Sequence, residues 1–491
     1  MARIWRVVVG VAIASFLITL YMALFNLLNE EPGTKHSKLV SVELPESVPI
    51  GHENLDLPNA TFGLKLPPFI ASNRESRDQP KMEFVKEVCN DATCMDGYVS
   101  HAWGHDDLNP ISKTHFDWYE HVSLFETTIR VLGGLLAAYE LDGDWAFIEK
   151  AIDLANRMLP AFDTPTGIPL NWIVLATGKV KPNYNAMLAE LGSIQLEFQY
   201  LSDITGNPVY AEKVLFVWEQ LHRIPIDVPG LYPERVQIGE FVVSSSKLSL
   251  GGTTDSYFEY LLKMWLGTGE RRYFEWYYEA AESIRQKLVV IAKAGHVYIP
   301  AAQLSWPKNG GMVIEHDEKF EHLTCFAGGM FATGALASKT GNWKQQYELG
   351  KQISETCWNM YAKSDTGIGG ENCDGETLDL RHTKYILRPE VVESLFYMWR
   401  YSHDQVYRDR AWAIANAINT YCRDDTGYHG LEHAGSKDSD PIDRQNDDTI
   451  PLEQYVFNTE AHVLSVRGFG KRADASKWVL YLRNIPDHWD G

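Results

Sequence analysis

Acidic side chains stand at the predicted starts of three apolar helices. Glu126 opens the first and Asp255 the second, while Glu390 and Glu393 open the third. Each has an ordinary structural explanation, because an acid in the first turn favours the helix dipole and Ser123-x-x-Glu126 is a capping box. Three such starts together, however, would crowd like charges that repel one another. Two kinds of chemistry require such crowding: hydrolysis of a glycosidic bond by paired carboxylates, and binding of a hard cation such as Ca²⁺ by oxygen ligands.

Basic and imidazole side chains accompany these acids. Arg130 lies one helical turn after Glu126, and Arg388 comes shortly before Glu390. His322 opens another apolar segment and is expected at the same level as the acids. A single histidine at such a position is more often a hydrogen-bonded core residue, so His322 alone does not indicate a site.

A repeated turn predicts the elements that position these residues. Each turn joins an apolar helix to an amphipathic one, and the five turns centre on Gly143, Gly206, Gly269, Gly341 and His403. Their spacings of 63, 63, 72 and 62 residues are typical of stacked helical hairpins. We therefore expect one repetitive all-α domain, although a chain of this length would also suit about three domains.

The two helices of each repeat differ in composition. The first is rich in Gly, Ala and Leu and should be buried all round, whereas the second has charged residues on one face. A ring of inner helices surrounded by outer helices, an α/α toroid, explains this difference, and a linear solenoid is the alternative. In a toroid the inner helices run in the same direction, so that the acids at their amino-terminal ends would meet at one mouth.

The composition excludes some partners. The 491 residues include 45 Lys and Arg against 65 Asp and Glu, a formal net charge of −20. Such an acidic chain binds polyanions poorly, so nucleic acid is not an expected partner. The 15 Trp, 24 Tyr and 20 Phe suit a large helical core and also carbohydrate recognition, since the faces of sugars are apolar. Six cysteines permit one to three disulfides in an oxidising compartment.

The amino terminus predicts a membrane anchor. Residues 7–28 are an uncharged apolar run, preceded by Arg3 and Arg6 and followed by Glu30 and Glu31. This run is long enough to cross a bilayer, and its flanking charges predict a type II orientation with residues 1–6 in the cytosol. A cleaved secretory signal is the alternative, and both interpretations send the rest of the chain into the secretory pathway.

A stem separates this anchor from the globular part. Seven of the 22 prolines fall within residues 29–80, so this segment should be a semi-extended luminal stem. The segment also contains the sequon Asn59-Ala60-Thr61, which fits a luminal location. We expect the α/α-barrel domain to cover residues 81–491.

The globular part resembles the class I α-1,2-mannosidases, glycoside hydrolase family 47. The resemblance follows the order of the family along nearly the whole domain, and its joint specificity is high although no single stretch is decisive. The matching stretches are AWGHDDLNPISK (102–113), SLFETTIRVLGGLLAAYEL (123–141), LPAFDTPTGIP (159–169), GSIQLEFQYLSDITG (192–206), DSYFEYLLKMW (255–265), HLTCFAGGMFATGA (322–335), LRPEVVESLFYMWR (387–400) and YVFNTEAH (455–462).

The resemblance implies an (α/α)7 toroid with Ca²⁺ at its floor. It also implies an inverting enzyme that trims terminal α-1,2-linked mannose from high-mannose N-glycans. Glu126 matches the general acid, Glu390 the general base and Asp255 a third essential carboxylate, while Thr459 matches the Ca²⁺ ligand. The residues that match sugar- or water-positioning groups are Arg130, Glu197, His322, Arg388, Glu393 and Glu460.

The resemblance also assigns one disulfide. Cys325 and Cys357 match the family's bridge between an inner helix and the following outer helix. The pairing of the other four cysteines stays open; these are Cys89, Cys94, Cys373 and Cys422. The matched bridge favours the glycan-processing branch of the family over its degradation-linked relatives, which usually lack it.

The chain departs from the family pattern at two places. Only twelve residues separate Lys113 from Glu126, where the family has a helical hairpin. Another inner helix of the family is absent between about Asp440 and Tyr455. The repeat therefore has five clear units instead of seven, which indicates either a spliced or mis-assembled version of an active enzyme or a chain that has lost activity. We favour the first explanation, because the retained motifs are intact and both breaks are abrupt.

A third departure concerns specificity. Thr253 stands two residues before Asp255, where enzymes of the endoplasmic reticulum that remove a single mannose carry Arg. The shorter side chain favours broader, Golgi-like trimming. Residence in the Golgi or in the endoplasmic reticulum stays open, and so does the alternative function of a mannose-binding, lectin-like protein in glycoprotein quality control.

Overall fold

The computed structural model describes residues 100–101, 107–109, 111–116, 121–183, 185–308, 310–425, 427–442 and 455–465. The predicted cytosolic tail, membrane anchor and stem lie outside the described residues, as do the sequon, Cys89 and Cys94. Among the helices that are described, none combines the length and the apolar character needed to cross a bilayer.

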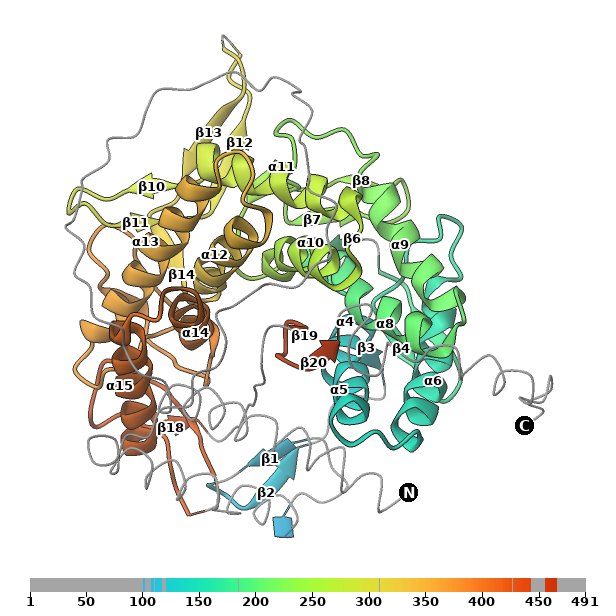
Figure 1. The fold of residues 1–491 in the computed structure, drawn as a ribbon, viewed down its shortest axis with the longest axis horizontal. Coiled ribbons are helices and arrows are strands. Elements are labelled where there is room, and N and C mark those ends of the chain that lie inside the picture. Colours follow the sequence, from blue (N-terminus) through green and yellow to red (C-terminus); the bar gives the residue numbers. More distant parts are fainter. Residues whose placement is uncertain are drawn as a thin grey trace.

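Helical hairpins arranged around a ring dominate the described residues (Figure 1). The predicted inner helices α5, α8, α10, α12 and α14 line the ring, and their partners α6, α9, α11, α13 and α15 lie outside them. The five pairs are α5 (Gly133–Asp142) with α6 (Ala146–Met158), α8 (Gln195–Thr205) with α9 (Val209–Leu221), α10 (Asp255–Thr268) with α11 (Arg271–Lys287), α12 (Ala327–Ser338) with α13 (Trp343–Ala362), and α14 (Glu390–Ser402) with α15 (Gln405–Tyr421). The predicted five-unit repeat is confirmed for this part of the chain.

The predicted turns end four of the five inner helices. Gly143, Gly206 and Gly269 follow α5, α8 and α10 with φ of 86°, 73° and 74°, and His403 follows α14 with φ 53°. This left-handed conformation lets the N–H of the terminating residue donate to a carbonyl of the last helical turn, as Gly143 does to Tyr139 O, and it suits glycine best. The exception is α12, which ends at Lys339 with φ 49°, two residues before the predicted Gly341.

The inner and outer helices differ in burial as predicted. Every residue of α8 except Asp203 is buried, and so is the whole of α12 from Ala327 to Ala335. The outer helix α6 buries only one stripe, and its members are Phe147, Ile148, Ala151, Ala155 and Met158. A helix that packs on both sides needs apolar residues all round, whereas one exposed to solvent needs them on one face only.

Small residues let an inner and an outer helix come close together. A Cβ atom added to Gly350 of α13 would lie only 2.6 Å from the carbonyl oxygen of Gly328 in α12. The two backbones therefore touch where both positions are glycine. This contact explains the Gly-rich composition that marked α12 in the sequence.

The fold also contains short strands, so the expectation of an all-α domain is correct only in its main architecture. The strands are β1 (Asp107–Asn109), β2 (Thr114–Phe116), β3 (Val122–Ser123), β4 (Trp172–Val174), β5 (Lys179–Lys181), β6 (Asn185–Met187), β7 (Arg235–Gln237), β8 (Val242–Val243), β9 (Lys247–Leu248), β10 (Val290–Ile291), β11 (Val297–Tyr298), β12 (Ala302–Ser305), β13 (Val313–His316), β14 (Lys319–Glu321), β15 (Asn372–Asp374), β16 (Leu380–His382), β17 (Gly430–Leu431), β18 (Pro441–Ile442), β19 (Tyr455–Phe457) and β20 (Val463–Ser465). They form antiparallel sheets of two or three strands, among them β3-β4-β5, β6-β7-β8, β13-β12-β9 and β14-β15-β16.

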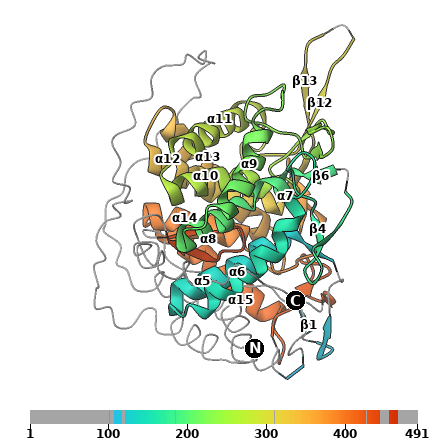
Figure 2. The ribbon, with the colours of Figure 1, turned by 90° about the vertical axis from the view of Figure 1, so that its right-hand side faces the viewer.

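These sheets belong to the connections that lead from an outer helix to the next inner helix. β4, β6 and the projecting β12–β13 hairpin accordingly lie on the same side of the ring in Figure 2. The connections between the helices of one hairpin are only a few residues long. The strand-bearing side is thus the side on which the inner helices begin.

The two stretches in which the family resemblance predicts additional helices contain few described residues. In the first, the described residues form β2, β3 and the three-residue α4 (Leu124–Glu126). In the second, they form the end of β18 and the start of β19. The β19–β20 hairpin enters the ring and contacts α5 and α10 (Figure 1).

Candidate active site

The segment with Glu126 is a composite helix. α4 leads into a π-helical turn, η1 (Thr127–Leu132), which continues as α5. The N–H of Glu126 donates to Ser123 Oγ at 3.1 Å, which is one half of the predicted capping box. The Glu126 carboxylate does not complete the box but accepts from Arg130 Nε at 2.7 Å. Its side chain is about half exposed (48%) and so can reach a ligand in the ring.

Asn171 fixes the start of this helix. Its side-chain oxygen accepts from Ser123 Oγ and from the N–H of Phe125, at 3.1 and 3.0 Å. Its amide nitrogen donates to Glu190 Oε1 at 2.7 Å. These contacts hold the backbone that carries Glu126 against a neighbouring loop of the ring.

Arg130 joins the predicted general acid to the carboxy-terminal hairpin. Its guanidinium contacts Glu126 Oε2 and Glu460 Oε2, both at 2.7 Å. Burial raises the pKa of Glu460, and the charge of Arg130 opposes that rise. The charges of Glu126 and Glu390 also raise the pKa of Glu460, so the three carboxylates lie near one another.

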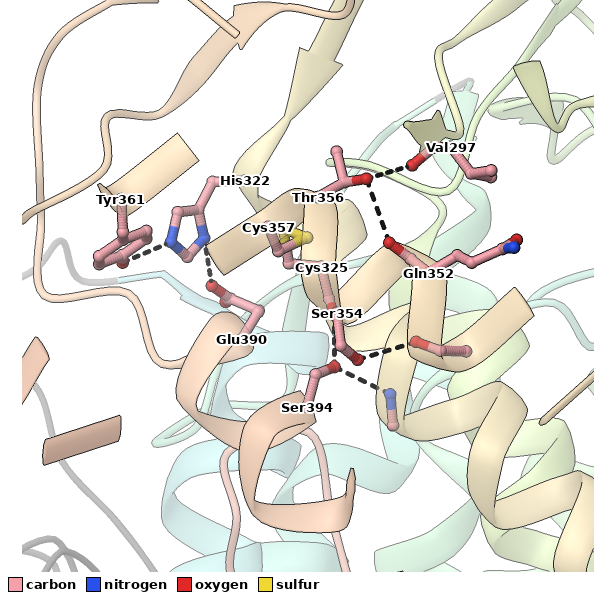
Figure 3. Close-up of a disulfide and its surroundings, with 12 residues drawn as sticks. Val297, His322, Cys325, Gln352, Ser354, Thr356, Cys357, Tyr361, Glu390 and Ser394 are labelled. Carbon is pink, nitrogen blue, oxygen red and sulfur yellow. Dashed lines mark hydrogen bonds and ion pairs between the residues drawn. A yellow bond between two sulfur atoms is a disulfide. The ribbon is translucent and has the colours of Figure 1, made fainter. Parts of the chain in front are cut away.

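Glu390 is held by a buried histidine (Figure 3). His322 begins the short helix η3 (His322–Phe326), and its Nδ1 lies 2.8 Å from Glu390 Oε2. Its Nε2 lies 2.7 Å from the hydroxyl of Tyr361 on α13. His322 is completely buried. Its Nε2 forms a hydrogen bond with Tyr361, whereas its Nδ1 and Glu390 Oε2 are in contact without a hydrogen bond of normal geometry.

Asp255 is the first residue of α10 and is half-buried near the other acids. Its Oδ1 accepts from the N–H of Ser256 at 2.8 Å. Burial, together with the charges of Glu259 and Glu390, raises the pKa of Asp255 to about 7. Thr254, not Asp255, occupies the N-cap position, and its side chain makes no capping hydrogen bond.

Arg388 is oriented by a carboxylate that the sequence did not single out. Its Nε and a terminal nitrogen each contact Glu371 at 2.6 Å, a bidentate pair. The charges of Glu390 and Asp255 help to raise the pKa of Arg388. Because Glu371 fixes the guanidinium plane, Arg388 offers a fixed positive charge beside the two predicted catalytic acids.

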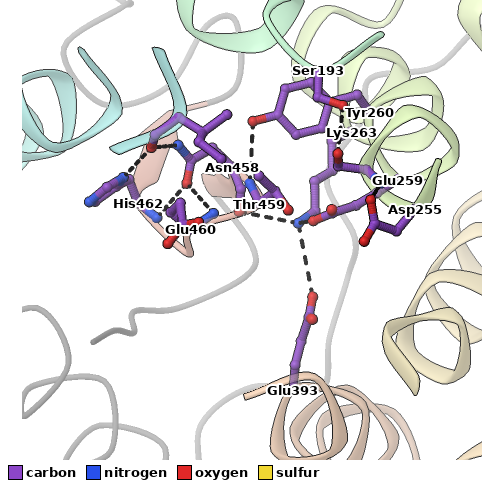
Figure 4. Close-up of polar contacts among 12 residues, drawn as sticks. Ser193, Asp255, Glu259, Tyr260, Lys263, Glu393, Asn458, Thr459, Glu460 and His462 are labelled. Atoms are coloured by element: carbon purple, nitrogen blue, oxygen red, sulfur yellow. Dashed lines mark hydrogen bonds and ion pairs between the residues drawn. The ribbon is translucent and has the colours of Figure 1, made fainter. Parts of the chain in front are cut away.

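A buried lysine lies among the acids at the floor of the ring (Figure 4). Lys263 of α10 forms an ion pair with Glu259 and lies 3.9 Å from Glu393 of α14. Burial raises the pKa of Glu393 to about 8, against the effect of Lys263. The ammonium also contacts the carbonyl oxygen of Asn458 at 3.5 Å.

Asn458 connects the β19–β20 hairpin to two inner helices. Its amide nitrogen donates to Ile129 O at 2.6 Å and to Glu197 Oε1 at 2.8 Å. Its oxygen accepts from the N–H groups of Glu460 and His462. α5 approaches so closely that a Cβ on Gly133 would lie 2.8 Å from His462 Nδ1. The hairpin is therefore seated against the helices that follow Glu126.

Comparison with known proteins identifies the family. A sequence profile of glycosyl hydrolase family 47 matches residues 114–466. The chain belongs to this family. It is 38% identical over 382 residues to mannosyl-oligosaccharide 1,2-alpha-mannosidase IC of Homo sapiens, an alignment that covers 72% of this chain and 59% of that relative. The chain thus spans less than two thirds of the length of the human relative.

Further relatives and solved structures align over more of their length. Mannosyl-oligosaccharide alpha-1,2-mannosidase IA of Drosophila melanogaster is 38% identical over 465 residues, covering 79% of this chain and 68% of the relative. The solved alpha-1,2-mannosidase from Trichoderma reesei superposes with a TM-score of 0.67 at 24% identity, covering 76% of this chain and 97% of that one. D-mannose isomerase superposes with a TM-score of 0.53 at 12% identity over 80% of this chain and 96% of that one, which shows a shared fold.

The site residues that match the family motifs fall into connected groups. Arg130 joins Glu126 to Glu460, His322 contacts Glu390, and Lys263 lies between Glu393 and the hairpin. The Cys325–Cys357 disulfide assigned from the family resemblance is present, whereas Cys373 and Cys422 are free and buried.

Thr459 lies beside a buried hydroxyl that contacts a buried carboxylate. Its N–H donates to the Tyr260 hydroxyl at 3.3 Å, and that hydroxyl donates to Glu197 Oε1 at 2.6 Å. Glu197 is fully buried, its Oε2 has no hydrogen-bond partner, and burial raises its pKa to about 7. No three His, Cys, Asp or Glu side chains in the described part of the chain are placed to bind a metal directly. Ca²⁺ at this position would therefore be held by Thr459 and by water on nearby carboxylates, as the family resemblance predicts.

Proposed function

We propose that this chain is an inverting, Ca²⁺-dependent exo-α-1,2-mannosidase that trims terminal mannose from high-mannose N-glycans. The observation that carries the proposal is the position of Glu126 and Glu390. They belong to inner helices on opposite sides of the ring (Figure 1), and Glu460 experiences the charge of both. The names of the relatives IA and IC support α-1,2-mannosidase activity on a mannosyl-oligosaccharide.

The two carboxylates have separate duties in this mechanism. Glu126 is about half exposed and donates a proton to the oxygen of the leaving sugar. Glu390 accepts a proton from the water that attacks the anomeric carbon from the other face. Inversion requires a separation that admits this water, which suits residues on opposing helices. Glu390 Oε2 lies against His322 Nδ1, so Oε1 is the oxygen that would face the water.

The surrounding residues bind and orient the substrate. Arg388, fixed by Glu371, and Arg130 offer donors to sugar hydroxyls. Asp255 and Glu393, with raised pKa values, can donate or accept hydrogen bonds near neutral pH. Ca²⁺, when bound at Thr459, would orient sugar hydroxyls and stabilise a distorted ring.

The proposed cellular compartment is based on residues 7–28, which lie outside the described residues. The apolar run at residues 7–28 supports a type II single-pass membrane protein of the Golgi or endoplasmic reticulum with a luminal catalytic domain. The disulfide fits such an oxidising lumen. The chain would then meet its glycoprotein substrates as they pass along the membrane.

Release of mannose from an α-1,2-linked disaccharide tests this function. The purified chain should release mannose with Ca²⁺ and lose activity with a chelator. Glycan binding without release under either condition would instead support the lectin-like alternative. Absence of both release and cooperative unfolding would indicate an inactive, incomplete isoform.

A further inference from the structure

Glu197 of α8 is a buried carboxylate whose two oxygens have different surroundings. Its Oε1 accepts two hydrogen bonds, from the Tyr260 hydroxyl at 2.6 Å and from the Asn458 amide at 2.8 Å. Its Oε2 is buried and has no hydrogen-bond partner in the described part of the chain. A buried carboxylate oxygen without a donor costs free energy, so Oε2 is the oxygen that a bound water would satisfy.

The directions of these hydrogen bonds follow from the groups involved. The backbone N–H of Thr459 can only donate, so the Tyr260 oxygen accepts from it at 3.3 Å and the Tyr260 proton goes to Glu197 Oε1. The Asn458 side-chain oxygen accepts from two backbone N–H groups of the hairpin, so its amide nitrogen is the atom that faces Glu197. Tyr260 therefore connects a carboxylate of α8 to the loop of the β19–β20 hairpin (Figure 4).

Thr459 is half-buried in this loop, between β19 and β20. Its N–H is bonded to Tyr260, and neither its hydroxyl nor its carbonyl oxygen has a hydrogen-bond partner among the described residues. An alcohol and a carbonyl oxygen are ligands that suit a hard cation. The bond to Tyr260 thus uses the one donor of the Thr459 backbone and leaves both oxygens for a ligand.

The inner helix α10 contacts the hairpin through two side chains about one turn apart. Tyr260, which is completely buried, bonds to Thr459, and Lys263 bonds to the carbonyl oxygen of Asn458 at 3.5 Å. Within the described residues, Tyr260 is the only side chain that hydrogen-bonds to Thr459 itself. The orientation of Thr459 therefore depends on the Tyr260 hydroxyl more directly than on the other contacts of the hairpin.

We propose that Tyr260 is a positioning residue of the cation site. Its hydroxyl orients the backbone of Thr459 and holds Glu197 by Oε1, which leaves Oε2 to accept from a water molecule of the bound cation. This inference rests on the Ca²⁺ dependence in the proposed function. Removal of a group that orients metal ligands typically weakens metal binding about 10- to 100-fold.

Calorimetric titration with Ca²⁺ tests this role without activity. Tyr260→Phe keeps the ring and removes only the hydroxyl, so the Kd for Ca²⁺ should rise at least about 10-fold. Tyr277→Phe is the matched control, because its buried hydroxyl donates to Met330 O at 3.3 Å, between α11 and α12, and its Kd should stay unchanged. An unchanged Kd in Tyr260→Phe, an equal loss in Tyr277→Phe, or no Ca²⁺ binding by the unsubstituted chain would overturn the proposal.

Glu197→Gln provides a second variant, which keeps the proposal testable if Tyr260→Phe does not fold. The amide oxygen must accept from Tyr260 and Asn458, so the NH₂ group takes the place of Oε2 and cannot accept from water. The Kd for Ca²⁺ should therefore rise in this variant as well. Full Ca²⁺ affinity in a folded Glu197→Gln chain would contradict the role given to Oε2.

Excess Ca²⁺ distinguishes positioning from damage to the fold. Mannose release by Tyr260→Phe should be low at Ca²⁺ concentrations that saturate the unsubstituted chain, and kcat should recover when Ca²⁺ exceeds the new Kd. A deficit that saturating Ca²⁺ does not relieve would show that the hydroxyl serves the fold, and it would overturn the proposal. If Tyr260→Phe binds Ca²⁺ more weakly than the unsubstituted chain but neither releases mannose, only the proposed function fails.

Discussion

At the scale of single residues, the site depends on carboxylates that are held by different partners. Glu126 contacts an arginine and Glu390 a buried histidine. Asp255 has a raised pKa because of burial first and the charges of neighbouring acids second. Because the environments differ, residues of the same type can act as acid, base and binding group in one cavity.

Glu390→Gln should abolish mannose release while preserving the fold. The amide has the same shape but cannot accept the proton of water, so kcat should fall by about 10²- to 10⁴-fold. Its thermal unfolding should stay close to that of the unsubstituted chain. The matched control is Glu275→Gln on the outer helix α11, where the exposed carboxylate forms an ion pair with Arg271. Full activity of Glu390→Gln would exclude it as the base.

Thr253→Arg should narrow the range of products. Thr253 has φ 82°, and its hydroxyl lies 3.4 Å from Glu234 Oε2 at the rim near Asp255. A long charged side chain there would restrict the space left for glycan branches. Mass spectrometry of a digested nine-mannose glycan should show several products for the unsubstituted chain and predominantly one for Thr253→Arg. Identical product ladders, with Thr253→Ala as control, would contradict this explanation of specificity.

At the scale of elements, the hairpin turns were predictable because each has a local cause. A left-handed residue must end an inner helix, and glycine is the residue most suited to it, as at Gly143 and Gly206. The strands were not predicted, because segments of two to four residues are too short to show alternation.

The partners of the site residues were equally hidden from the sequence. Tyr361 lies 39 residues from His322 and Glu371 lies 17 residues from Arg388. Such pairs depend on how helices pack, which no local pattern encodes. The family motifs identified the acids themselves, but not the groups that orient them.

Asn458→Ala should loosen the β19–β20 hairpin. The change removes donors to Ile129 and Glu197 and leaves buried groups unsatisfied, so the free energy of unfolding should fall by about 2–4 kcal/mol. Ca²⁺ should also bind more weakly, because Thr459 adjoins Asn458. Urea titration and calcium calorimetry measure the two effects.

Ser465→Ala is the control for that experiment. It deletes a hydrogen bond of 2.8 Å to Glu140 in the same hairpin but away from Thr459. It should lower stability with little change in calcium binding. Equal losses of calcium affinity in both variants would show that Asn458 has no special role.

At the scale of the whole molecule, part of the net charge of −20 can be located in the structure. Some of those carboxylates meet where the inner helices begin, on the side that carries the small sheets. Arg130, Arg388 and Lys263 offset part of this charge. A cation and sugar hydroxyls would offset more, which links ligand binding to stability.

The stability of the ligand-free chain should fall between pH 6.5 and 8. Burial raises the pKa of Asp255 and Glu197 to about 7 and that of Glu393 to about 8. Over this interval the folded state keeps protons that the unfolded state has lost, so the free energy of unfolding decreases as pH rises. Buried His222 and His462, whose pKa values are lowered to about 4, act in the opposite direction only below about pH 6.5.

Thermal unfolding at the two pH values measures this dependence. Tm should be lower at pH 8, and Glu393→Gln should reduce the difference because one titrating group is removed. Glu275→Gln should leave the difference unchanged. A Tm that increases over this interval would show that burial does not disfavour the ionised form of these carboxyl groups.

The configuration of the first released sugar tests the central claim most directly. Proton NMR of α-1,2-mannobiose with the chain and Ca²⁺ resolves the two anomers before mutarotation mixes them. An acid at Glu126 and a base at Glu390 that activates water predict β-mannose as the first product. Initial release of α-mannose, or no release by the folded chain, would contradict the account.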